Sequence, residues 1–171
     1  VKAPTWMEKY KVAEQRDLER EAKRLLGDLD SISHRIGHFA LVSSSLFTTG
    51  RQLETAVIRI FSDFEWKVDD LTKKAKPIDY IIHDRNSPRE LMIALTGTTG
   101  YIGADNKKIA QLFGALALVG EQQRLVFLVN ALAEDDPGSR TVQKCITEEA
   151  LKRLTKHDIC VLFVHDLYML W

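Results

Sequence analysis

Short apolar runs in the second half of the chain place the strongest limit on its fold. Residues 125–129 and 159–164 are almost entirely apolar, as is typical of strands buried on both faces of a sheet. Two further runs, 78–83 and 91–96, flank the polar segment 84–89, which indicates a β-hairpin. A chain with these runs needs a central sheet and helices to cover it.

Apolar residues at helical spacing predict those helices. One face of residues 51–64 is apolar, and Thr49 with Gln52 forms a possible capping box. A second helix is expected over residues 105–118, capped by Asp105, and a short third one between residues 147 and 154. With a strand near 66–71, the order predicts an α/β domain with a mixed sheet covered on both faces.

The first 41 residues have a different pattern. A 4-3 alternation of apolar residues is typical of a coiled-coil seam; it comprises Leu18, Ala22, Leu25, Leu29, Ile32, Ile36 and Phe39. We therefore expect two parts, a helical arm over 1–41 and the α/β domain over 42–171. The arm is one long helix or two helices hinged near Gly27. Its stripe packs either on its own domain or on another chain, and we favour another chain.

Charge and hydropathy exclude several classes of protein. The chain has 171 residues, with 24 basic and 24 acidic side chains and a formal net charge of +0, so any contact with nucleic acid needs a local basic patch. No apolar run approaches the ~18–20 residues of a membrane span, and the N-terminus lacks a signal-peptide core. We expect a cytoplasmic protein without membrane contact. Because the first residue is Val1, we also expect a fragment or a processed product.

Several chemical signatures are weak or missing. The glycine-rich residues 96–103 have neither the spacing of a dinucleotide-binding loop nor a Gly-Lys-Ser/Thr ending. His34 and His38 lie one helical turn apart, but no carboxylate between them completes a metallopeptidase motif. The two cysteines form no framework, and Cys160 is expected to be a buried thiol. No metal site is assigned on these residues.

The carboxylates carry more information. Asp79 begins the first arm of the expected hairpin, directly after Pro77-Ile78, and Glu54 lies on the preceding helix. The chain resembles the restriction-endonuclease-like, or PD-(D/E)xK, superfamily. In that superfamily an Asp on one arm and a Glu-x-Lys on the other hold Mg²⁺ and position a water for attack on phosphodiesters.

The resemblance extends over about residues 46–169 and rests on the order of short matching pieces. These are residues 49–57, 95–100, 129–131, 146–150, 157–162 and 166–168, together with Pro77-Ile78-Asp79. The resemblance implies a central mixed sheet flanked by helices, in agreement with the reading from periodicity.

The departure from the family pattern is as informative. Alignment on Gly97 places Ala94 at the motif's Glu position and Thr96 at its Lys position. Alanine cannot bind a cation and threonine has no positive charge, so the site is degenerate. The remnant candidates are Asp79, Glu54 and Thr96, with Gln111 on the following helix. We expect no cofactor, with Mg²⁺ bound only if activity survives.

Three functions follow as expectations. The first is a catalytically inactive nuclease-like domain that binds nucleic acid or a protein, with a candidate basic patch whose residues are Lys73, Lys74, Lys107 and Lys108. The second is an oligomerisation or scaffold module built on the arm, which contacts a second copy or a protein partner. The third is an active metal-dependent nuclease in which catalytic residues have migrated, for example to Lys107, Lys108 and Gln111.

Overall fold

The computed structural model describes residues 12–72 and 77–171. The chain divides into two compact units, with the boundary between Ala40 and Leu41, and each unit is described by itself. None of the helices in the described ranges combines the length and the apolarity that crossing a membrane needs. The fold is α/β, with a long N-terminal helix and a five-stranded mixed sheet flanked by helices.

The arm is one uninterrupted helix. Helix α1 extends over Ala13–Ser44 and passes through Gly27 without a hinge. Of the two arrangements left open by the sequence, the single helix is present. It is also longer than the arm expected over 1–41, because Ser43 and Ser44 form its last turn. Their hydroxyl groups suit a helix end because Ser44 Oγ donates to the Leu41 carbonyl at 2.6 Å.

Five strands form the sheet in chain order. They are β1 Lys67–Asp70, β2 Tyr80–His83, β3 Glu90–Gly97, β4 Gln123–Asn130 and β5 Cys160–Phe163. Strands β1, β2 and β3 pair antiparallel, whereas β3, β4 and β5 pair parallel. The expected hairpin of β2 and β3 is therefore confirmed, and Tyr80 lies opposite Ile93.

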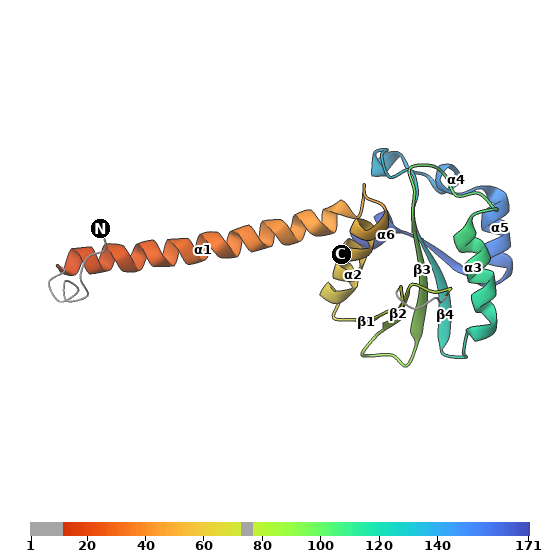
Figure 1. Ribbon diagram of the computed structural model, residues 1–171, viewed down its shortest axis with the longest axis horizontal. Coiled ribbons are helices and arrows are strands. Elements are labelled where there is room, and N and C mark those ends of the chain that lie inside the picture. The colour runs from red at the N-terminus through yellow and green to blue at the C-terminus, as the bar shows by residue number, and fades with distance from the viewer. Residues whose placement is uncertain (1–11, 73–76) are drawn as a thin grey trace. The chain divides into compact units, whose positions relative to one another are not determined.

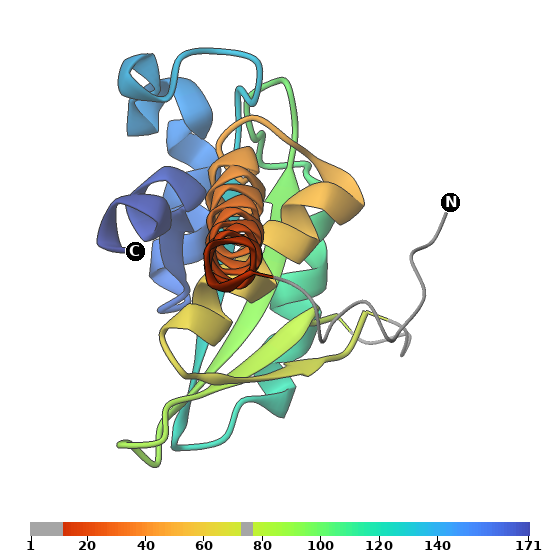
Figure 2. The ribbon, with the colours of Figure 1, turned by 90° about the vertical axis from the view of Figure 1, so that its left-hand side faces the viewer.

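Helices cover both faces of the sheet (Figures 1 and 2). The elements outside the sheet and the arm are α2 Gly50–Asp63, α3 Lys107–Ala115, α4 Val142–Cys145, α5 Glu148–Lys156 and α6 Val164–Leu170, with 3-10 turns at Leu116–Leu118 and Pro137–Ser139. One core layer joins α3 and α5 to the sheet around Phe127. The other joins α2 and α6 to the opposite face, around Phe61 and Leu128.

Both of the expected helix caps are wrong, whereas Thr147 caps a helix without having been assigned that role. Thr49 precedes α2, but its side chain makes no capping hydrogen bond. Helix α3 begins later than expected and is capped by Asn106, whose Oδ1 accepts from the Lys108 amide, rather than by Asp105. Thr147 caps α5 and accepts from the Ala150 amide at 3.3 Å. A neighbouring Asn thus took the role assigned to Asp105, since both residue types are good caps.

The last strand and its thiol differ from the expectation. Cys160 was expected to be buried, but its side chain is exposed. Strand β5 lies at the edge of the sheet, so one side of it has no neighbouring strand. Apolar character alone does not show whether a helix covers that part of the sheet.

A buried amide fixes the connection between α1 and α2. Asn130, at the end of β4, is 2% exposed and donates to the carbonyls of Ser45 and Thr48, both at 2.9 Å. Arg140 donates to its Oδ1 at 2.9 Å. The Asn130 side chain is thereby satisfied, and it joins the loop after α1 to the loop that follows β4.

Gly97, at the end of β3, is required by close packing. A Cβ atom there would lie 2.7 Å from Leu53 Cδ2 and 3.1 Å from the Thr49 Cα. The Leu53 methyl can rotate away, but the Thr49 backbone cannot do so without moving the start of α2.

We expect Gly97→Ala to lower the free energy of unfolding by about 1–3 kcal/mol because of this overlap. The matched control is Gly114→Ala in α3, where an added Cβ meets nothing within 4 Å. That change should leave stability unchanged or raise it by up to about 1 kcal/mol. Urea unfolding followed by circular dichroism measures both, and equal stability of the two variants would contradict the packing argument.

Candidate functional site

The hairpin of β2 and β3 places Asp79 beside Ala94. The Asp79 amide donates to the Ile93 carbonyl at 2.9 Å, and its own carbonyl accepts from the Leu71 amide at 2.8 Å. Since Tyr80 lies opposite Ile93, continuing the ladder by one residue brings Asp79 next to Ala94. The pairing of the two arms therefore agrees with the sequence alignment, which placed Ala94 across from Asp79.

Lysine 108 binds the Asp79 carboxylate directly. Its Nζ lies 2.7 Å from Oδ1 and 2.7 Å from Oδ2, and the Leu95 amide donates to Oδ2 at 2.8 Å. The side chains of Lys108 and Asp79 are 28% and 17% exposed. Because Asn106 caps the helix at the Lys108 amide, this lysine is fixed in the first turn of α3, from which it reaches the strand.

This arrangement is a balanced ion pair and a poor metal site. Mg²⁺ binds through carboxylates together with several waters in near-octahedral geometry. Here the carboxylate already accepts from an ammonium and an amide, and the neighbouring Ala94 is fully buried and has no side-chain oxygen. Within the ranges 12–72 and 77–171, no group of three or more His, Cys, Asp or Glu side chains could hold a metal ion.

The other remnant candidates do not bond to Asp79. In the part of the chain that the structure describes, no hydrogen bond joins Asp79 to Glu54, Thr96 or Gln111. Glu54 and Thr96 are half-buried, on α2 and at the end of β3, whereas Gln111 is exposed on α3.

The pKa of Tyr80 responds to the carboxylates around the start of β2. Burial raises the pKa of its hydroxyl well above the usual value, and the carboxylates of Glu54, Asp79 and Asp70 raise it further. That hydroxyl is buried and has no hydrogen-bond partner among the described residues. Glu54 and Asp79 thus act on the same tyrosine without contacting one another.

The proposed basic patch is only partly visible. Lys73 and Lys74 lie outside the described residues. Lys107 is exposed, whereas the charge of Lys108 is balanced by Asp79. Of the two patch lysines that the structure describes, Lys107 is therefore the one with an exposed side chain.

Arg140 forms a second polar cluster that the sequence analysis missed. Besides Asn130, its guanidinium donates to the carbonyls of Ala133 and Asp135, the latter at 2.6 Å. Desolvation lowers its pKa, and burial raises the pKa of the nearby Cys145 thiol. Because backbone carbonyls occupy the guanidinium, this cluster holds the loop after β4 in place. A Val-Asn-Ala sequence at a strand end was the only signal for it.

A ladder of polar side chains crosses one end of the sheet. His83 lies 3.0 Å from Asp69 Oδ2 and 3.0 Å from Glu90 Oε1, and Glu90 accepts from the Gln123 side chain at 2.7 Å. The ladder therefore links β1, β2, β3 and β4 in sequence. Its members pair across strands, which is an ordinary way to stabilise a sheet.

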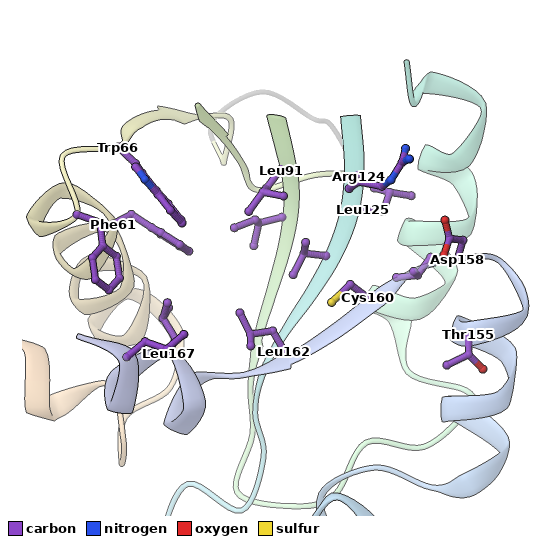
Figure 3. Close-up of a pocket in the computed structure, with 15 residues that line it drawn as sticks. Phe61, Trp66, Leu91, Arg124, Leu125, Thr155, Asp158, Cys160, Leu162 and Leu167 are labelled. Atoms are coloured by element: carbon purple, nitrogen blue, oxygen red, sulfur yellow. The ribbon is translucent and has the colours of Figure 1, made fainter. Parts of the chain in front are cut away.

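An apolar groove lies on the face of the sheet that carries α2 and α6 (Figure 3). Its volume is about 710 Å³, and its labelled walls include Phe61, Trp66 and Leu167 on one side and Asp158 on the other. Cys160 and Leu162 form part of its floor, which explains the exposure of the Cys160 thiol.

Comparison of the chain with models of known families, with curated protein sequences and with solved structures gave no match. The chemistry of the site is therefore argued from its own geometry.

We expect Lys108→Met to lower the free energy of unfolding by about 1–3 kcal/mol, because it leaves a mostly buried carboxylate without its cation. The neighbouring Lys107→Met, at an exposed side chain, should change stability by less than about 0.5 kcal/mol. Adding Asp79→Asn to Lys108→Met should recover part of the loss. Thermal and urea unfolding measure all three, and an unaffected Lys108→Met protein would show that the ion pair is not formed in solution.

Asp69 gives a prediction on pH. Hydrogen bonds from Lys67 and His83 lower the pKa of Asp69 below its ordinary value of 3.8. The folded state thus gains from this carboxylate above that value, and the gain is lost as the pH falls through the lowered pKa. Carbon-detected NMR titration should place the Asp69 midpoint below 3.8, and Lys67→Met should move it upwards.

Proposed function

We propose that this protein is a non-catalytic association module, in which a nuclease-like α/β domain with a closed metal site is carried on a helical arm that binds another helix. The exposed seam on α1 carries this proposal. Its large apolar members are each 51–64% exposed, and they are Leu18, Leu25, Leu29, Ile32, Ile36 and Phe39.

An exposed apolar stripe of this length favours a partner. Helix α1 has 32 residues, of which Val42 alone is buried, whereas most helices in proteins gain their stability from the packing of an apolar face. Contiguous apolar surface on this scale is typical of an interaction site. A helical partner suits the 4-3 spacing, because that spacing keeps one seam facing a neighbouring helix.

The state of Asp79 supports a role without catalysis. Lys108 neutralises the carboxylate, and Ala94 supplies no second ligand. The same ion pair also favours one alternative, an active nuclease in which Lys108 replaces the missing motif lysine. That alternative requires Mg²⁺ to compete with the ammonium for Asp79.

A cleavage assay separates these two functions. With Mg²⁺ or Mn²⁺, we expect the unmodified protein not to cut single- or double-stranded DNA or RNA. A single carboxylate that is already paired with a lysine does not supply enough ligands to hold the metal ion. Metal-dependent cutting that Asp79→Asn and Lys108→Met both abolish would replace the proposal with the active-nuclease alternative.

Sedimentation tests the association. We expect the chain to form dimers or larger species, and Leu29→Glu with Ile32→Glu to give folded monomers, since the two charges fall in the seam. The control pair Ser31→Glu and His34→Glu has the same spacing but lies away from the stripe, and it should leave association intact. A monomeric native chain at 100 µM would contradict the proposal.

A further inference from the structure

The sequence around the α1 seam allows the orientation of the pair to be inferred. Resting on the proposed function, we propose that α1 binds α1 of a second copy in an antiparallel two-helix coiled coil, with Ala22 of one copy packed against Phe39 of the other. The argument uses the charges beside the seam and the sizes of the side chains within it.

The spacing of the stripe assigns every position of the heptad. In the 4-3 alternation, Ala22, Leu29 and Ile36 occupy a positions, whereas Leu18, Leu25, Ile32 and Phe39 occupy d positions. The charged g positions, which lie beside the seam, are therefore Glu21, Asp28 and Arg35.

The residues at the e positions, on the other flank of the seam, disfavour a parallel pair. They are Glu19, Leu26, Ser33 and Ala40. In a parallel pair each g residue faces the next e residue of the neighbouring helix. Asp28 would then face Ser33 and Arg35 would face Ala40, so neither charge would meet its opposite.

An antiparallel pair brings the two g flanks together. Asp28 of one copy then faces Arg35 of the other, and two-fold symmetry makes this contact twice. Asp28 is held within its own helix only by an exposed 3.4 Å contact with Arg24, and pairs of that kind contribute little. The flank is therefore complementary to a second copy of itself.

Side-chain size selects the register. The layer that puts Asp28 opposite Arg35 also puts Phe39 opposite Ala22, a large residue against a small one, and Leu29 opposite Ile32. Alternation of large and small residues across facing positions lets layers interlock. A shift by one heptad would pair Glu21 with Arg35, but it would place Asp28 opposite Asp28 of the second copy, which is repulsive, and Phe39 opposite the polar Gln15.

A charge exchange tests the orientation. Arg35→Glu alone should weaken dimerisation about tenfold, because it creates two like-charge contacts in place of two ion pairs. Asp28→Arg combined with Arg35→Glu restores opposite charges and should return the dissociation constant to within about twofold of the native value. In a parallel pair both changes face neutral residues, so equal dissociation constants for the single and double variants would overturn the proposal.

Cross-linking tests the register in the full chain. Ala22→Cys and Phe39→Cys are made separately in a Cys160→Ser background, which removes the exposed native thiol, and one variant carries a size tag. With a short bismaleimide, we expect a covalent dimer only when the two variants are mixed. In the antiparallel register the two copies of position 22 are about 25 Å apart along the axis, too far for the reagent.

The outcomes separate this inference from the proposed function. Cross-linking of the Ala22→Cys protein with itself would show a parallel pair. Cross-linking of Ala22→Cys to Ile32→Cys, rather than to Phe39→Cys, would show the shifted register. Either result overturns the inference about orientation and register, while the association through α1 stands. A monomer in sedimentation contradicts the proposed function itself.

Discussion

The side-chain amide of Asn130 is the contact on which the arrangement of the α/β domain depends. It ends β4, the strand between the two parallel neighbours β3 and β5, and it bonds to the loop after α1 and to Arg140. The loop after α1 and the end of β4, which are far apart in the chain, thus meet at one buried polar group, together with Arg140 from the loop that follows β4. Removal of any partner would leave the others unsatisfied in the core, which costs more than the hydrogen bond contributes.

The contact between Asp79 and Lys108 has a structural role in the domain. A carboxylate at the start of β2 needs a cation when it is mostly buried. The first turn of α3 supplies that cation, since Asn106 fixes the amide of Lys108 while the side chain extends to the strand. The geometry favours stability of the layer between α3 and the sheet, and it leaves little room for a divalent ion.

The regular elements could be predicted from the sequence because they follow periodicity. The hairpin, the strand at β4 and the faces of α2 and α3 all bury residues at regular spacing. The position of Ala94 beside Asp79 was an expectation from the alignment on Gly97, and the register of β2 and β3 agrees with it.

Other features depended on contacts that periodicity does not encode. Asn106 and Asp105 are neighbours, and both residue types are good helix caps, so the sequence does not show which of them caps α3. The exposure of Cys160 depends on how far α2 and α6 extend over the sheet. The Lys108 contact was foreseen only as one of several residues able to reach the strand. Helix α6, over Val164–Leu170, follows a strand without an intervening loop, and no break in composition marked its start.

The mixed sheet has a consequence for the time course of folding. Strands β1, β2 and β3 are joined by short connections, so their antiparallel half can form from local contacts. Parallel pairing of β3 with β4 joins residues such as Glu90 and Gln123, 33 positions apart, and the Asn130 contact to Ser45 extends over 85. Contacts of such separation close slowly, because loop entropy is lost before they form. The meander of β1–β3 should therefore gain protection from hydrogen exchange earlier than the parallel half does.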